Sequence, residues 1–145
     1  MEKITVALIA HDGRKENMAR LTETHASRLA GLHLVATKST GQMVQESTGL
    51  PVTLMQSGPL GGDQQVGSLV TSGVVKAVIF LRDPLTAQPH EPDITALMRV
   101  CDVHNVPLAT NLASAEALLH LIFEHPELLR HSRLKAQMDN EIAIA

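Results

Sequence analysis

Short runs of apolar residues alternate along the chain with longer segments of mixed polarity. Each run is too short to be a buried helix and is followed by polar or glycine-containing residues, which is typical of strands buried on both faces of a parallel sheet. The pattern predicts strands at residues 4–10, 32–36, 52–56, 75–81 and 106–109.

The segments between these runs are typical of helices that are apolar on one face. Helices are predicted within residues 18–29, around residues 42–47, after Gly62, within residues 94–101 and within residues 115–122. Pro126 ends the last of these patterns, and one more helix with a polar end is expected in the tail to residue 145. Five strands separated by helices predict an α/β fold, an open and mostly parallel five-stranded sheet with helices on both faces.

Most of the unusual polar residues lie directly after the predicted strands. They are His11 and Asp12, residues 37–41, residues 57–63, residues 83–90, and Thr110 with Asn111. In open α/β sheets, ligands bind beyond the carboxyl ends of the strands. We therefore expect one functional site built from these loops.

Length, composition and charge favour a small single-domain protein and argue against nucleic-acid binding and a membrane segment. The chain has 145 residues, which favours a single domain over residues 1–145. Two phenylalanines are the only aromatic residues besides histidine, and the net charge is -3, so nucleic-acid binding is not expected. The single Cys101 is interpreted as a small apolar residue of a helix face, and the lack of a signal or an apolar span predicts a cytoplasmic protein without a membrane segment.

The glycine-rich segment 57–65 is the most informative stretch. Glycines allow backbone N–H groups to approach an anion, and a helix start adds a favourable dipole, so a phosphate could lie against Ser57 and Gly58. A plain turn is the alternative. Asp63 is either the N-cap of the following helix or a positioned carboxylate base.

Two further loops hold candidate side chains. Residues 37–41, Thr-Lys-Ser-Thr-Gly, offer hydroxyl donors at another helix start, with helix capping as the alternative. Lys15 could reach an anion, or it could be a solvated surface lysine. His90 lies in a proline-stiffened loop between Asp83 and Asp93, where a carboxylate can fix the tautomer of an imidazole. The eight histidines form no ligand motif, so no metal site is predicted.

These segments resemble the methylglyoxal synthase family. The similarity runs in register from about residue 4 to residue 118. It rests on Ala-His-Asp at 10–12 with Lys15, the loop 36–41, Gly-Gly-Asp-Gln-Gln-Val-Gly at 61–67, Asp-Pro-Leu at 83–85, Pro-His at 89–90 and Ala-Thr-Asn at 109–111. The resemblance implies a Rossmann-like, homohexameric lyase without metal or cofactor. Such an enzyme converts dihydroxyacetone phosphate to methylglyoxal and inorganic phosphate through an enediolate, and phosphate often inhibits it.

The resemblance also implies roles for particular residues. Asp63 would remove a proton from the substrate, and His90 would polarise and protonate an oxygen of the enediolate, oriented by Asp83 and Asp93. His11 and Asp12 would line the substrate. The phosphate-binding residues would be Lys15, Thr37, Ser39, Thr40, Ser57 and Gly58.

Two departures from the family pattern stand out. Lys38 occupies a position where the family usually has glycine, and the tail beyond about residue 122 does not align. The alternative function is a non-catalytic domain of the same fold that binds a phosphate or nucleotide effector. Such a domain needs the phosphate loops but not the base and the histidine, and here Asp63, His90 and Asp93 are all present.

Overall fold

The computed structural model describes residues 2–130, in which five parallel strands form one sheet in the order β3-β2-β1-β4-β5. The strands are β1 (Thr5–Ala10), β2 (His33–Ala36), β3 (Thr53–Leu54), β4 (Val75–Leu81) and β5 (Leu108–Ala109). The predicted open, parallel five-stranded sheet is confirmed. The edge strands β3 and β5 are shorter than the apolar runs that predicted them.

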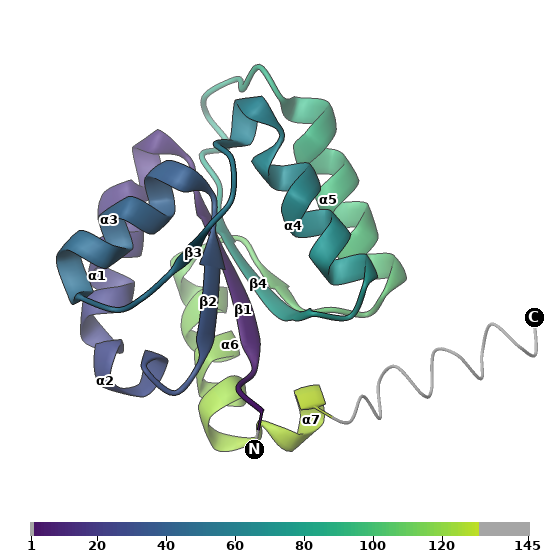
Figure 1. Cartoon of the computed structure of the whole chain (residues 1–145). Coiled ribbons are helices and arrows are strands. Elements are labelled where there is room, and N and C mark those ends of the chain that lie inside the picture. Colours follow the sequence, from purple (N-terminus) through teal and green to yellow (C-terminus); the bar gives the residue numbers. More distant parts are fainter. Residues whose placement is uncertain (1, 131–145) are drawn as a thin grey trace, which may run out of the picture.

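The helices cover both faces of the sheet, as Figure 1 shows. One face carries α1 (Lys15–Thr24), α3 (Lys38–Thr48) and α6 (Leu112–Glu124), and the other carries α4 (Gly62–Thr71) and α5 (Glu91–Val103). Shorter elements are α2 (Ala26–Leu29), α7 (Glu127–Arg130) and the 3-10 turns η1 (Asp12–Arg14) and η2 (Gly58–Leu60). The helix expected after Pro126 begins as α7, and the rest of that predicted helix lies outside the described residues.

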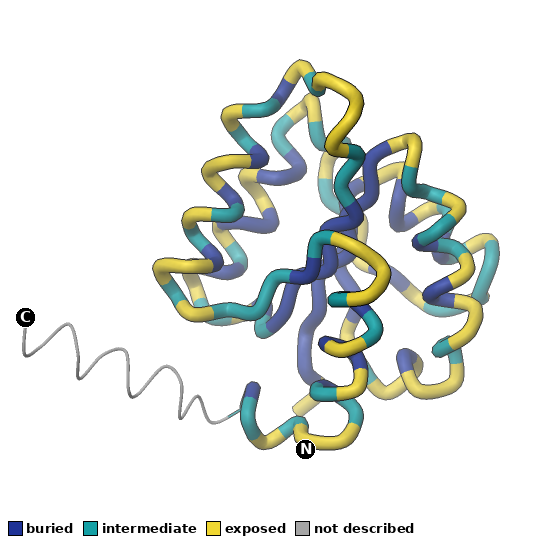
Figure 2. Tube along the Cα trace, turned by 180° about the vertical axis from the view of Figure 1, so that it is seen from behind, coloured by how far each residue is buried: buried dark blue, intermediate teal, exposed yellow. Residues whose placement is uncertain are grey.

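The central strand β1 is buried along its whole length, as the dark blue tube at the centre of Figure 2 shows. Successive side chains of a strand point to opposite faces. Val6 and Leu8 therefore pack in the core under α1, α3 and α6, whereas Ala7 and Ile9 pack in the core under α4 and α5. This two-sided burial explains why β1 reads as a continuous apolar run rather than an alternating one.

Two helices differ from their sequence patterns. The predicted helix within residues 18–29 is divided at His25, whose backbone leaves the helical region and whose ring bonds Glu116 at 2.8 Å. α3 begins at Lys38 rather than near Gln42, directly after the extended residue Thr37. The sequence pattern missed this start because the first turn of the helix is polar and shows no hydrophobic spacing. Residues 38–41 are thus a helix start, not a loop.

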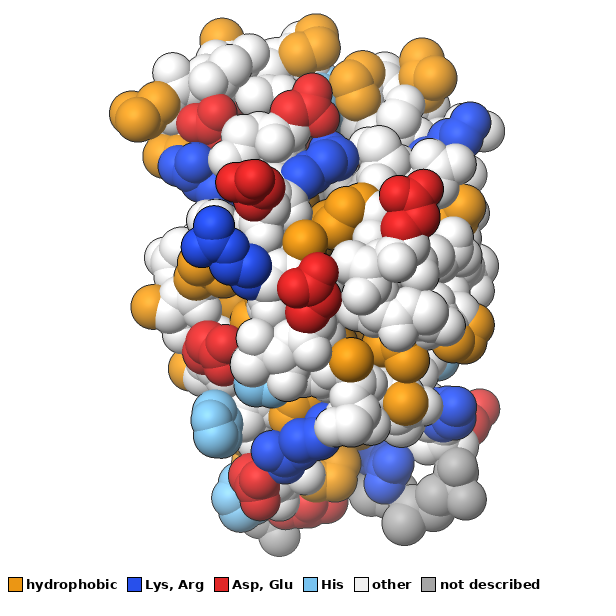
Figure 3. Space-filling model, turned by 90° about the vertical axis from the view of Figure 1, so that its left-hand side faces the viewer, with side chains coloured by type: hydrophobic (Ala, Val, Ile, Leu, Met, Phe, Trp, Pro, Cys, Tyr) orange, Lys and Arg blue, Asp and Glu red, His pale blue; other side chains and the backbone are white. Residues whose placement is uncertain are grey.

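No helix within residues 2–130 has the length and apolar character needed to cross a bilayer. On the face seen in Figure 3, acidic and basic side chains are interspersed rather than gathered into one basic patch.

Candidate active site

A cavity of about 260 Å³ opens beyond the carboxyl end of β1. The chain runs from β1 to β2 on one side, and β4 joins β1 on the other side, so this is the point where the strand order reverses. Ligands of open α/β sheets bind at such points. Nine of the twelve predicted site residues line the cavity: His11, Asp12, Lys15, Thr37, Ser39, Ser57, Gly58, Asp63 and His90.

Asp63 is fully buried at the base of this cavity. Within residues 2–130, neither of its carboxylate oxygens has a hydrogen-bond partner. Burial raises the pKa of this carboxyl above its ordinary value; the charge of His90 opposes that shift and the charge of Asp93 adds to it. A buried carboxylate without hydrogen bonds is costly, and such groups with perturbed pKa values are typical of functional sites.

The alternative role of Asp63 as a helix cap is wrong. The N-cap of α4 is Gly61, which has a left-handed φ of 100°, and Asp63 lies in the first turn with no capping bond. Only glycine fits at position 62, because a Cβ there would overlap the carbonyl oxygen of Gln56. The glycines therefore turn the chain so that Asp63 faces inward.

His90 stands beside this carboxylate. It precedes α5, and its Nε2 lies 3.5 Å from Oδ2 of Asp63, with both side chains buried. Its Nδ1 is buried and has no hydrogen-bond partner within residues 2–130. A Cβ on Gly58 would come within 2.6 Å of Nε2, so glycine is what allows the η2 turn to lie this close to the ring.

His11 also lines the cavity, next to His90. The backbone N–H of Asp83 donates to its Nδ1 at 2.9 Å, so that nitrogen is an acceptor and the neutral ring carries its proton on Nε2. Burial is the main reason that the pKa of His11 is lowered, followed by the charge of His90. The two imidazole rings meet edge to face at 6.1 Å between centroids, so a neutral donor and a second imidazole share the cavity.

Lys15 brings a cation to the rim. Its Nζ donates to the carbonyl oxygen of Ala10 at 3.0 Å and to Oδ1 of Asp12 at 2.8 Å. The bond from Lys15 lowers the pKa of Asp12, whose side chain is fully exposed. The ammonium is therefore held at the carboxyl end of β1 by the backbone.

The first turn of α3 contributes differently from what was expected. Thr37 and Ser39 line the cavity, but Thr40 does not. The Thr40 hydroxyl accepts from Ala10 N–H at 3.2 Å, donates to Ala10 carbonyl oxygen at 3.3 Å and accepts from the Thr37 hydroxyl at 3.3 Å. A hydroxyl has one donor and two acceptor sites, so all three are used. Lys38 is exposed and does not line the cavity.

Neither Asp83 nor Asp93 bonds His90 within residues 2–130, although the resemblance implied that both orient it. Asp93 accepts a bond from Nε2 of Gln64 at 2.9 Å, and Asp83 contacts His11 through its backbone. The carboxylate of Asp83 instead accepts from the N–H of Leu85 at 3.1 Å.

Gln88 also lines the cavity and was not among the predicted site residues. Its place in the same proline-stiffened loop, two residues before His90, was the available signal. Across residues 2–130, no group of three or more His, Cys, Asp or Glu side chains is arranged to hold a metal ion.

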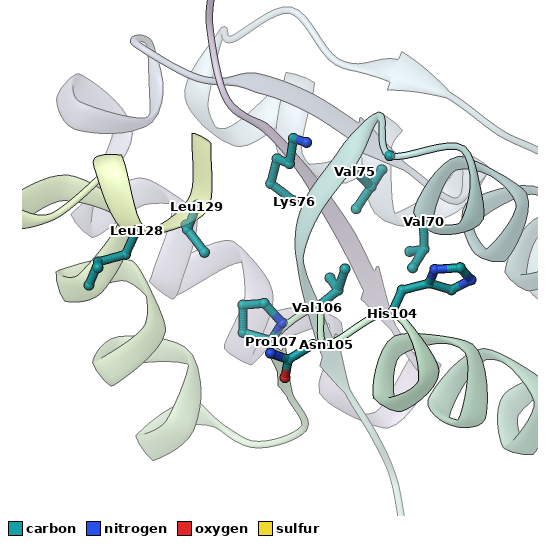
Figure 4. Close-up of a pocket in the computed structure, with 10 residues that line it drawn as sticks. Val70, Val75, Lys76, His104, Asn105, Val106, Pro107, Leu128 and Leu129 are labelled. Atoms are coloured by element: carbon teal, nitrogen blue, oxygen red, sulfur yellow. The ribbon is translucent and has the colours of Figure 1, made fainter. Parts of the chain in front are cut away.

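A separate, smaller cavity of about 50 Å³ lies at the opposite end of the sheet, where β4 begins (Figure 4). The described residues that line it are mainly aliphatic, with Lys76, His104 and Asn105 as polar members and no carboxylate among them. It lacks the paired acid and base groups found beyond β1.

Comparison with known proteins places these features in a family. Residues 17–110 match the model of the MGS-like domain. The chain is 58% identical over 121 residues to methylglyoxal synthase of Moorella thermoacetica, covering 83% of this chain and 94% of that protein. It is 51% identical over 129 residues to methylglyoxal synthase of Bacillus subtilis, covering 86% of this chain and 94% of that protein.

A solved structure is similar as well. The crystal structure of methylglyoxal synthase from Elizabethkingia anophelis NUHP1 matches with a TM-score of 0.76 and 43% sequence identity. The match covers 81% of this chain and 77% of that chain.

Proposed function

Because the chain belongs to the methylglyoxal synthase family, and is therefore a lyase, we propose that it converts dihydroxyacetone phosphate to methylglyoxal and inorganic phosphate. The observation that carries this proposal is the buried Asp63 carboxylate, which has no hydrogen bond within residues 2–130 and lies 3.5 Å from His90 in a cavity lined by a lysine and hydroxyls. A base, proton donors for oxygen and an anion clamp are the groups that this reaction needs.

Asp63 is the proposed base. It takes a proton from the hydroxymethyl carbon of the substrate, and the electron pair moves onto the carbonyl oxygen to give an enediolate. The raised pKa of Asp63 suits this task, because a base with a pKa closer to the working pH accepts a proton more readily than an ordinary carboxylate does.

The two histidines are the proposed groups that stabilise the developing oxyanions. His90 donates to one oxygen from the same side as Asp63 and moves a proton there as the enediolate forms. His11 presents a neutral Nε2 donor whose orientation is fixed by the Asp83 backbone N–H. In this proposal Asp83 orients His11 rather than His90, and Asp93 acts on the pKa of Asp63 through its charge.

The phosphate clamp decides the outcome of the enediolate. Phosphate leaves with the electron pair of the broken C–O bond only if that bond lies across the plane of the enediolate. As it leaves, the oxygen of the former hydroxymethyl group gives its proton to His90 and becomes the aldehyde oxygen, and the remaining enol is protonated at carbon to give methylglyoxal. Lys15, Thr37, Ser39, Ser57 and Gly58 all line the cavity. In the first turn of α3 the N–H of Lys38 donates to the carbonyl oxygen of Gln56, and those of Ser39 and Thr40 are the proposed donors for the anion. The hydroxyl of Thr40 supports the clamp without touching phosphate.

Every step above is assigned to a side chain or backbone group of this chain, so the proposed reaction uses no metal and no cofactor. Product phosphate binds the same clamp and is the proposed inhibitor. By its family resemblance we further propose a single-domain, cytoplasmic homohexamer. Light scattering of the purified chain measures the oligomeric state.

One assay tests the function. The purified chain is incubated with dihydroxyacetone phosphate, and methylglyoxal and inorganic phosphate are measured together. The two products are expected in equal amounts, and Asp63→Asn serves as the inactive control. Phosphate binding without either product would contradict the proposal and favour the effector-binding alternative.

A further inference from the structure

Another cavity, of about 310 Å³, lies at the carboxyl ends of β4 and β5 beside the start of α6. Its polar lining residues are Arg14, Asn17, Arg82, Thr110 and Asn111, and its apolar ones are Leu81, Pro84 and Leu112. None of these residues lines the cavity that holds Asp63 and His90. We call it the arginine cavity.

The two arginines make this cavity locally basic on a chain with a net charge of -3. Within residues 2–130, neither forms an ion pair with a carboxylate. The charge of Arg14 acts on Asp83, but that carboxylate is bonded to the N–H of Leu85 and does not line the cavity. Among residues 2–130, no carboxylate in the wall of the arginine cavity therefore neutralises its positive charge.

Arg82 gives the second observation. Its Nε is buried and, within the described part of the chain, has no hydrogen-bond acceptor. A buried N–H without an acceptor costs about 1–3 kcal/mol, so such groups are rare without a reason. An oxygen of a bound anion would supply the missing acceptor, and the planar guanidinium group suits the paired oxygens of a carboxylate or phosphate.

We propose that the arginine cavity is a second binding site, separate from the active site, that takes a small metabolite carrying a carboxylate or phosphate group. Arg14 and Arg82 bind the anionic group, and Thr110 and Asn111 offer further polar contacts. The site is joined to the active site through the backbone, because Arg82 is followed by Asp83, whose N–H holds His11.

Calorimetric titration of the full chain with inorganic phosphate, and separately with citrate, tests the proposal. Two classes of phosphate site per chain are expected, one of which depends on Lys15. The Arg14→Gln and Arg82→Gln variants should each weaken the other class at least tenfold, which corresponds to about 1.4 kcal/mol. That loss should shrink as salt is raised. Whichever of phosphate and citrate binds the arginine cavity more tightly shows whether the natural ligand carries a phosphate or a carboxylate group.

Arg20→Gln is the matched control, because Arg20 is exposed on α1, lines neither cavity and carries the same charge. It should leave both classes unchanged. Arg14 is only partly buried in a short turn, so its variant is expected to fold even if the variant of Arg82 does not. A single class of site for both probes, an unchanged second class in Arg14→Gln, or an equal loss in Arg20→Gln would overturn the proposal.

Discussion

Nε2 of His90 lies 3.5 Å from Oδ2 of Asp63, and that carboxylate is completely buried. The separation is slightly too long for a hydrogen bond. Both groups are therefore available to a substrate, and substitutions at each position can test their roles separately.

Replacement of the proposed base should abolish turnover. Asp63→Asn keeps the size of the side chain but cannot take a proton, and a positioned base commonly contributes about 10² to 10⁴ in rate. We expect a loss on the order of a thousandfold in kcat, with phosphate binding retained. Asp102→Asn, at an exposed position of α5, is the control that should remain active. Near-normal turnover by Asp63→Asn would contradict the assignment.

The same variant should change the pH dependence of stability. The folded state raises the pKa of Asp63, mainly by burial, so between its unfolded and folded pKa values the folded chain holds more protons than the unfolded chain. This group's contribution to stability is therefore lost as pH rises from about 4, the ordinary Asp value, through the folded pKa. The free energy of unfolding of Asp63→Asn minus that of the wild type should increase with pH over this window.

Urea denaturation at a series of pH values measures that difference. The exposed Asp102→Asn control should show a nearly constant difference from the wild type. If the difference for Asp63→Asn is equally flat, the buried carboxylate does not titrate abnormally and the environment described for it is wrong.

His90 should affect the chemical step more than binding. If it stabilises oxygen charge that develops in the transition state, His90→Gln should lower kcat much more than it raises KM. His104→Gln is a suitable control, because His104 lies at the end of α5 away from the active-site cavity. A change confined to KM would make His90 a substrate-binding residue instead.

Lys38 should have little influence on phosphate. Its side chain is exposed and outside the cavity, so Lys38→Gly should keep phosphate affinity within about threefold, less than about 1 kcal/mol. Lys15→Gln provides the contrast, since it removes the cation that lines the cavity. Titration with phosphate at low and high ionic strength measures both. A large, salt-sensitive loss for Lys38→Gly would mean that its ammonium reaches the anion.

Thr40 should be important for stability through Ala10. Thr40→Val removes the hydroxyl that bonds both the N–H and the carbonyl oxygen of Ala10, and a buried polar group left unsatisfied costs about 1–3 kcal/mol. Thr40→Ser keeps the hydroxyl and should retain most of this stability. Urea denaturation compares the two variants with the wild type. Equal destabilisation by Val and Ser would show that the methyl group, not the hydroxyl, is what matters.

The order of strands and helices could be predicted from the pattern of apolar residues. The buried runs predicted all five strands, and β4 has the predicted bounds of 75–81. Because the carboxyl ends of parallel strands meet at one edge of the sheet, the positions of the polar residues after β1 and β4 were enough to assign them to a common site. Helix starts were less accessible, as α3 illustrates, since a polar first turn leaves no hydrophobic period to read.

Which atoms of the site lack hydrogen-bond partners could not be predicted in this way, because it depends on how the chain folds. Local sequence could not separate a cap from a base at Asp63, because both roles place a carboxylate at a helix start. The structure excludes the cap, since the N-cap of α4 is Gly61, and the role of base stays a proposal. The sequence could not show either that the Thr40 hydroxyl is bonded to Ala10, which is 30 residues away along the chain. Nor could it show that Arg14 and Arg82 line one cavity, because no sequence motif connects them. Hydrogen-bond partners and burial depend on groups distant in sequence, and a sequence pattern records only which residue types are near one another along the chain.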